Sequence, residues 1–326
     1  MITDKGYHTY QGYECLSACI SNYLRWKNIT ISASDIFFLG NGFSLFYEND
    51  TERILSDMYM SNYSFMNDYH INYESRNADD EKEAKNILRD SILNEDMIMI
   101  KVAAEGLKYN RIYQQAGDSQ HFLNIIGWND LDVYVSDGFV PTRKFSIYEG
   151  WVEQKNILEA WKKKNFDYYV INYLELPGDD IDVYKEVKQM IISSILEYVD
   201  VFEKNTTIYG YSAMIHVMDN LREKLLDKDY PLSERTLYLN HQLRVYGFLS
   251  AKKMLLEEMI HYGVKADLCN EYQLIVERWS RLLMKMVKIG FSRNLNDFEM
   301  MYADMLRILE KENDLLVHIA EAFKKL

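Results

Sequence analysis

The sequence predicts an α+β domain followed by an all-α helical bundle. Nine of the fourteen glycines precede residue 177, and short runs rich in Ile, Val and Tyr lie in the same part of the chain. After residue 180, apolar residues recur at helical spacing over long stretches. The Pro-Gly-Asp-Asp segment at 177–180 reads as a break between these two patterns. We therefore predict one domain at residues 1–176 and a second at residues 177–326.

The first domain is expected to contain two helices and four strands. Helical patterns cover residues 15–27 and 79–93. The acidic run at 79–83 suits a solvated helix start, because carboxylates are stabilised near the positive end of the helix dipole. Four apolar runs bounded by Gly, Asn or Asp are predicted as strands: residues 97–102, 122–128, 132–135 and 168–174. The middle two are expected to form a hairpin.

The second domain is expected to be an antiparallel bundle of five helices. The predicted segments are residues 181–204, 207–227, 232–262, 267–289 and 295–323. Ile191, Ile195 and Val199 form one apolar stripe at the spacing of a helix face. The last break is placed at the Gly-Phe-Ser segment 290–292. Apolar stripes on more than one face would permit a homodimer.

Composition narrows the class of protein. Hydrophobic residues at 48% and charged residues at 27% are those of an ordinary globular chain. With 37 Lys and Arg against 50 Asp and Glu, the formal net charge is −13, which argues against nucleic acid as a partner. Residues 1–176 hold 17 basic and 26 acidic residues, so most of the negative charge belongs to the first domain.

The sequence also predicts a cytoplasmic protein outside the membrane. No apolar run approaches the ~20 residues that span a bilayer, and the N-terminus lacks a basic start followed by an apolar stretch. Three cysteines cannot staple a chain of this size, so a reducing compartment is expected.

Cys15 is the first candidate for chemistry, because it stands at the start of the helix predicted for residues 15–27. A thiol there feels the positive end of the helix dipole, which favours the nucleophilic thiolate. Cys19, one turn later, should point into the core. The alternative is that both cysteines are small buried apolar residues.

His121 and Asp137 are the candidate partners of Cys15. His121 stands at the mouth of one predicted strand and Asp137 at the end of the next, so the two side chains can lie side by side on a hairpin. A carboxylate in that position orients an imidazole, which activates a thiol brought from a separate helix. Gln11 could supply its side-chain amide to an oxyanion hole, together with the backbone N–H of Cys15.

In this order of Gln11, Cys15, His121 and Asp137, the chain resembles the papain-like cysteine enzymes. More narrowly, it is similar to the N-terminal domain of the butirosin side-chain acyltransferase family, in which the cysteine helix is followed by a Gly-rich, aromatic segment, here residues 35–47. It also resembles the papain-like homologue that forms amide bonds in closthioamide biosynthesis. The resemblance implies a papain-like fold, with an antiparallel sheet and a nucleophile helix.

The resemblance further implies an amide synthase of natural-product biosynthesis. Such an enzyme moves an acyl group from the thioester of an acyl carrier protein, through acyl-Cys15, to an amine or diamine acceptor. Cys15 would be the nucleophile, His121 the base, Asp137 the orienting carboxylate and Gln11 part of the oxyanion hole, with no cofactor. Two alternatives stay open: a peptidase or amidase in which water replaces the amine, and a ligand-binding protein without catalysis.

Other motifs are interpreted as structural. The Gly-Asn-Gly segment at 40–42 lacks the Gly-Lys-Ser/Thr of a phosphate loop. Cys15 and Cys19 share an i, i+4 spacing, but no second His or Cys pair completes a metal site. His8 is a rival base without an orienting hairpin, and Cys269 lacks a His–Asp partner. We therefore predict no metal.

In the second domain, two lysine pairs are the only hint of a basic face for an acidic carrier protein: Lys252-Lys253 and Lys285/Lys288. Arg278, Trp279 and Arg281 share one amphipathic segment, for which core packing is the preferred interpretation. Packing against the first domain and contact with substrate are the alternatives.

Overall fold

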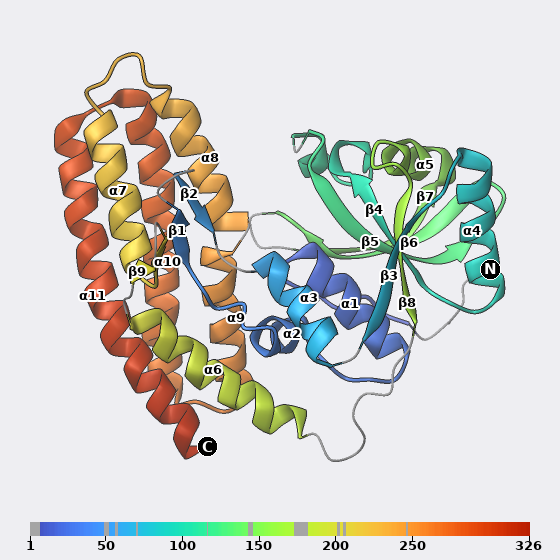
Figure 1. The fold of residues 1–326 in the computed structure, drawn as a ribbon, viewed down its shortest axis with the longest axis horizontal. Helices are drawn as coiled ribbons and strands as arrows, with labels where there is room; N and C mark the ends of the chain where they lie inside the picture. The colour runs from blue at the N-terminus through green and yellow to red at the C-terminus, as the bar shows by residue number, and fades with distance from the viewer. Residues whose placement is uncertain are drawn as a thin grey trace. The chain divides into compact units, whose positions relative to one another are not determined.

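The computed structural model shows two compact units (Figure 1). It describes residues 7–48, 52–55, 58–69, 71–115, 117–142, 146–172, 182–200, 203–204, 207–245 and 247–326. The first unit combines Met1–Ile36 with Asn62–Gly178, and the second combines Phe37–Ser61 with Asp179–Leu326. The predicted boundary at 176/177 falls outside the described residues and stays a prediction. The grouping of Phe37–Ser61 with the second unit has no counterpart in the predicted division.

The first unit is built on a six-stranded antiparallel sheet. Its strand order is β3-β8-β4-β5-β6-β7. These strands are β3 (Asn72–Asn77), β8 (Asp167–Asn172), β4 (Ile98–Ala103), β5 (Gln120–Trp128), β6 (Asp132–Val140) and β7 (Ser146–Glu153). The four strands predicted from the sequence are all present, and the predicted hairpin is β5–β6. The two edge strands, β3 and β7, were not predicted.

Helices cover both faces of this sheet (Figure 1). Helix α1 (Cys15–Trp26) packs against β5 and β6 on one face, and α4 (Glu81–Leu93) and α5 (Gln154–Lys162) pack on the other. The core under α4 and α5 contains five fully buried residues: Leu88, Ile100, Leu123, Val135 and Trp161. Two short 3-10 turns, η1 (Ala104–Gly106) and η2 (Arg111–Gln115), connect β4 to β5.

The acidic start of α4 confirms the interpretation of a solvated helix terminus. Asp80 is the N-cap residue, and its carboxylate accepts a hydrogen bond from the backbone N–H of Glu83 at 2.8 Å. Glu83 in turn accepts from the backbone N–H of Asp79 at 2.7 Å. The first bond satisfies an amide that the first turn of a helix leaves without a partner, and the second fixes the residue before the cap.

The second unit is mainly helical. It contains α6 (Val183–Val199), α7 (Ser212–Lys224), α8 (Leu232–Val245), α9 (Phe248–His261), α10 (Ala266–Ser292) and α11 (Leu295–Lys325). A small antiparallel sheet accompanies them in the order β2-β1-β10-β9: β2 (Arg53–Leu55), β1 (Phe46–Glu48), β10 (Thr207–Tyr209) and β9 (Glu203–Lys204). Helices α2 (Ala33–Leu39) and α3 (Met58–Asp68) each cross the division between the units.

Four predicted helix limits were wrong in this unit. The helix predicted for residues 181–204 ends at Val199, and Glu203–Lys204 form β9, which pairs with β10. The segment predicted to begin a helix at residue 207 begins with β10, because Thr207–Tyr209 pairs with Phe46–Glu48 of β1. The predicted helix at 232–262 is broken at Gly247, whose φ of 150° belongs to a region that glycine occupies freely. Gly290, predicted to mark a break, lies inside α10. There a Cβ would stand 1.9 Å from Thr236 Oγ1, so the glycine permits close packing on α8.

No helix among the described residues combines the length and apolar character needed to cross a membrane.

Candidate active site

Cys15 is the first residue of α1, and Glu14 caps that helix. The Glu14 carboxylate accepts hydrogen bonds from the backbone N–H groups of Leu16 at 2.8 Å and Ser17 at 2.7 Å. The same carboxylate accepts from Cys15 Sγ at 3.2 Å and from Asn62 Nδ2 at 3.1 Å. Glu14 is buried, so a negative group stands directly beside the candidate nucleophile.

The chain leading into α1 is fixed by contacts with that helix and with β6. Asn22 holds the backbone of Tyr10 from both sides: its Oδ1 accepts from the Tyr10 N–H at 2.8 Å, and its Nδ2 donates to the Tyr10 carbonyl at 2.9 Å. The backbone N–H of Gly12 donates to the Gly138 carbonyl at 2.8 Å. These bonds connect the N-terminal approach of Cys15 to the strand that carries Asp137.

The side chains of His121 and Asp137 meet as the hairpin geometry predicts. His121 Nε2 lies 3.1 Å from Asp137 Oδ1, and both side chains are buried. Since Nε2 faces the carboxylate, the opposite ring nitrogen, Nδ1, takes no part in this contact. A carboxylate placed in this way favours the tautomer with the proton on Nε2 and a lone pair on Nδ1.

Two tyrosines complete the environment of Asp137, and the sequence reasoning missed both. The hydroxyl of Tyr113 donates to Asp137 Oδ2 at 2.5 Å and lies 3.0 Å from His121 Nε2. The hydroxyl of Tyr109 donates to the same oxygen at 2.6 Å, and the backbone N–H of Phe139 donates to Oδ1 at 3.0 Å. Burial and the Asp137 charge raise the pKa of both phenols, which keeps them protonated as donors.

The thiol of Cys15 is less acidic than the helix dipole alone would make it. Burial, followed by the charge of Glu14, raises its pKa well above the ordinary value, while the backbone N–H of Phe122 opposes this by hydrogen bonding to the sulfur. The expectation that α1 favours the thiolate of free Cys15 was therefore wrong. A buried carboxylate at 3.2 Å outweighs a dipole contribution of about 0.3–1 kcal/mol.

The contact with Phe122 also places Cys15 beside the strand that carries His121. Phe122 follows His121 directly in β5, and its backbone amide reaches the sulfur. Tyr113, hydrogen-bonded to Asp137, lies near enough for a thiolate at Cys15 to raise the pKa of its phenol. The structure thus gathers Cys15, His121 and Asp137 in one region of the first unit.

The other candidates in the first unit have simpler surroundings. Gln11 is exposed on the segment before α1, and His8 is exposed as well. Cys19 is buried, and burial together with Asp137 raises its pKa, which agrees with its predicted place in the core. Among the described residues, no three His, Cys, Asp or Glu side chains are grouped so that they could hold a metal ion.

In the second unit, the predicted basic face is wrong at Lys252. This lysine is buried, and its Nζ lies 2.6 Å from the Glu312 carboxylate. Trp279 is fully buried, and its Nε1 donates to the same carboxylate at 2.8 Å, in agreement with the preferred core packing. Cys269 is buried near the start of α10, while Arg278 and Arg281 are exposed.

Comparison with known proteins adds a relationship for the first unit. Residues 14–138 match the family model of butirosin biosynthesis protein H, N-terminal. The match begins one residue before Cys15 and ends one residue after Asp137, so it includes three of the four predicted site residues and leaves out Gln11. It confirms the resemblance to the butirosin family over these residues, which are less than half of the chain. No curated protein matches the chain. The nearer likeness to the closthioamide homologue stays a prediction.

Proposed function

We propose that this protein is a cysteine-dependent acyltransferase of natural-product biosynthesis, with a papain-like catalytic unit. The observation that carries the proposal is the 3.1 Å contact between His121 Nε2 and Asp137 Oδ1. Because that contact leaves Nδ1 as the basic nitrogen, His121 is suited to take a proton from a thiol on α1. The match to the family of butirosin biosynthesis protein H supports acyl transfer in antibiotic biosynthesis as the setting.

The first half-reaction transfers an acyl group to Cys15. The proton of the thiol moves to Nδ1 of His121 while Sγ bonds to the carbonyl carbon of a thioester on an acyl carrier protein. The tetrahedral intermediate then releases the thiol of the carrier, which recovers the proton from His121. Because the pKa of free Cys15 is raised, proton transfer to His121 accompanies the attack instead of preceding it.

Stabilisation of the oxyanion falls to donors near the start of α1. The Glu14 carboxylate accepts hydrogen bonds from the backbone N–H groups of Leu16 and Ser17. It accepts none from the backbone N–H of Cys15. The backbone N–H of Cys15 is therefore one donor, and the side-chain amide of Gln11 is the second. Gln11 is exposed, so it would turn toward the sulfur when the substrate binds.

The second half-reaction forms an amide. The nitrogen of an amine or diamine bonds to the acyl carbon, its proton passes to His121, and Cys15 leaves as a thiolate that regains that proton. The attacking nitrogen must be uncharged, so a diamine whose second nitrogen is cationic suits the acidic character of the chain, whose formal net charge is −13. The reaction would take place in the cytoplasm, where three free cysteines stay reduced.

The test is intact-mass analysis after incubation with an acyl-carrier thioester. We expect the unaltered protein to gain the mass of the acyl group, and an added amine to remove it as an amide. The Cys15→Ala variant should gain no mass. Cys19→Ala is the matched control, since it changes a cysteine of the same helix that is buried in the core, and it should acylate normally.

Each alternative has its own outcome in this experiment. Release of the free acid alone, with amine present, would indicate a hydrolase in which water opens acyl-Cys15. No adduct and no turnover over a broad set of thioesters would favour a ligand-binding protein without catalysis. Full transfer by Cys15→Ala would overturn the assignment of the nucleophile.

A further inference from the structure

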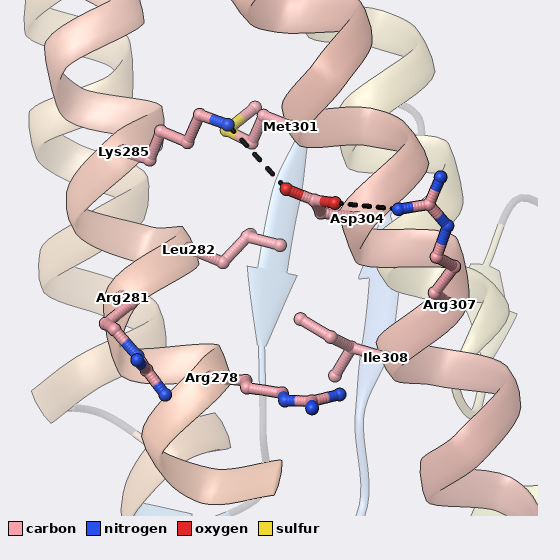
Figure 2. Close-up of a pocket in the computed structure, with 8 residues that line it drawn as sticks. All are labelled: Arg278, Arg281, Leu282, Lys285, Met301, Asp304, Arg307 and Ile308. Atoms are coloured by element: carbon pink, nitrogen blue, oxygen red, sulfur yellow. Dashed lines mark hydrogen bonds and ion pairs between the residues drawn. The ribbon is translucent and has the colours of Figure 1, made fainter. Parts of the chain in front are cut away.

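A groove of about 320 Å³ lies between α10 and α11 of the second unit. Figure 2 shows it as a gap between two neighbouring helices, with side chains from both reaching into it. Its lining consists of Arg278, Arg281, Leu282, Lys285, Met301, Asp304, Arg307 and Ile308. This volume is at the lower end of the range for small-molecule sites, about 300–1,000 Å³, so it suits a small ligand.

The groove has an apolar floor and a cationic rim. Leu282, Met301 and Ile308 are buried, and their side chains form the floor. Arg278 and Arg307 are exposed on opposite helices, and Figure 2 shows the guanidinium of Arg278 reaching into the gap below Ile308. A ligand that fits both parts must combine an anionic group with an apolar one.

The charges of the lining are unbalanced. Asp304 is its one acidic residue, and it is already engaged by Lys285 at 3.7 Å and Arg307 at 3.1 Å. Within the described part of the chain, no carboxylate lies within ion-pair distance of Arg278 or Arg281. Four basic side chains against one carboxylate leave the lining with a formal charge of +3.

The sequence around α10 adds to the positive charge of the groove. From residue 278 to residue 296 there are five basic residues and no acidic residue, in a chain whose net charge is −13. A local cationic surface on an acidic protein attracts anions to that place and not to the rest of the molecule. Guanidinium groups are well suited to the task, since they bind phosphate and carboxylate oxygens with paired N–H donors.

We propose that the α10–α11 groove is a binding site for an organic phosphate. The phosphate group is held by Arg278 and Arg281, whose guanidinium groups have no carboxylate to pair with, and the organic part lies on Leu282 and Ile308. A phosphate dianion matches the surplus of positive charge better than a single carboxylate does. This site goes beyond the proposed acyl transfer, because it lies within the second unit and uses none of the residues assigned to that chemistry.

Calorimetric titration of the full chain at low ionic strength tests the proposal with three probes. We expect phenyl phosphate, which carries both features, to bind saturably at one site. Inorganic phosphate lacks the apolar part and should bind about threefold to tenfold more weakly, and phenol lacks the charge and should not bind. Failure of phenyl phosphate to saturate would overturn the proposal, as would equal binding of phenol.

Variants then locate the site. The double variant Arg278→Gln/Arg281→Gln should weaken phenyl phosphate binding by about tenfold, since each exposed charged contact contributes a few-fold. Lys265→Gln is the matched control: it removes an exposed cation near the start of the same helix, about 20 Å from residue 278, and should leave the affinity unchanged. Equal weakening in the double variant and in Lys265→Gln would show general attraction to a basic surface and would contradict the site. Because these side chains are exposed, the variants should keep the thermal midpoint of the unaltered chain.

Discussion

At the scale of single residues, Cys15 is governed by the residue before it. Glu14 caps α1 through two backbone amides and also accepts from the thiol at 3.2 Å. The cap stabilises the helix, while its charge opposes formation of a second negative charge on the sulfur. Together with burial, this charge keeps free Cys15 as a neutral thiol, so the proposed chemistry depends on His121 as base.

Replacing Glu14 with Gln should therefore make Cys15 more acidic. The variant keeps an oxygen for the helix cap but removes the charge that raises the thiol pKa, so the pH profile of alkylation by iodoacetamide should move to lower pH. Loss of one amide partner should lower the free energy of unfolding by about 1 kcal/mol. Glu149→Gln is the control, because Glu149 contacts Thr9 and Tyr134 and not the thiol. An unchanged or upward-shifted profile in Glu14→Gln would contradict this account.

Part of this site could be predicted from the sequence, and the rest is visible only in the fold. Cys15, His121 and Asp137 were recognisable because a helix start and a hairpin are local patterns with defined positions. Tyr109 and Tyr113 were not, because the chain has 26 tyrosines and only the fold shows which hydroxyls reach Asp137. The role of Glu14 was missed because only the structure shows that its carboxylate caps α1 and also accepts from the Cys15 thiol.

At the scale of elements, the position of α1 depends on two glycines. A Cβ at Gly138 would stand 2.7 Å from the carbonyl oxygen of Tyr10 and 2.9 Å from the Cβ of Ala18. A Cβ at Gly12 would stand 2.7 Å from the same Ala18 atom. Without side chains at these two positions, α1 can lie close to β6, which carries Asp137.

Gly138→Ala should thus destabilise the first unit and displace α1. Backbone and helix atoms surround the added methyl group, so we expect a loss of about 1–3 kcal/mol in the free energy of unfolding, measured with urea. Acylation of Cys15 should slow as well, because α1 carries the thiol. Gly150→Ala on β7 is the control: its nearest neighbour is the movable hydroxyl of Tyr148 at 3.1 Å, and its cost should be smaller. Equal costs for both variants would refute the close-approach argument.

The missed elements share a physical cause. Strand β3 is almost entirely exposed, and β7 has one buried residue, Val152, among exposed and half-buried ones. Neither strand therefore shows the alternation of a half-buried strand. Thr207–Tyr209 became β10 only because β1, more than 150 residues earlier, supplies its partner. The central strands were predictable because both of their faces are buried, which leaves continuous apolar runs.

At the scale of the whole molecule, buried polar groups are concentrated within apolar cores. In the second unit, Lys252 and Glu312 form a buried pair, and the lysine Nζ lies 4.1 Å from the ring centroid of Phe248. Burial lowers the pKa of Lys252, although Glu312 opposes that change. Burying two charges costs desolvation free energy, which is offset only where further hydrogen bonds satisfy the buried groups. Here the Trp279 Nε1–H donates such a bond to Glu312.

The buried tyrosines set the alkaline limit of stability. Burial raises the pKa of Tyr109 and Tyr113 in the first unit and of Tyr198 and Tyr272 in the second. Below the ordinary tyrosine pKa of 10.0 both the folded and unfolded states keep these protons. Above it, the unfolded chain releases them first, so the free energy of unfolding should fall as the pH rises from about 10. Lys252 and Lys253, whose pKa values are lowered by burial, act in the opposite direction, but they are two groups against these four.

Tyr272→Phe isolates one contribution to this alkaline loss. The Tyr272 hydroxyl is buried and has no hydrogen-bond partner among the residues that the structure describes, and nearby Glu312 adds to the effect of burial on its pKa. Near neutral pH the variant should be as stable as the unaltered chain or slightly more stable, because an unsatisfied buried hydroxyl is removed. At about pH 11, one unit above the pKa of an unfolded tyrosine, it should retain about 1.4 kcal/mol of unfolding free energy that the unaltered chain loses.

Urea unfolding at both pH values measures this difference, and Tyr238→Phe, at a position 40% exposed, should show neither effect. The same alkaline loss in Tyr272→Phe and the unaltered chain would mean that Tyr272 does not hold its proton in the folded state.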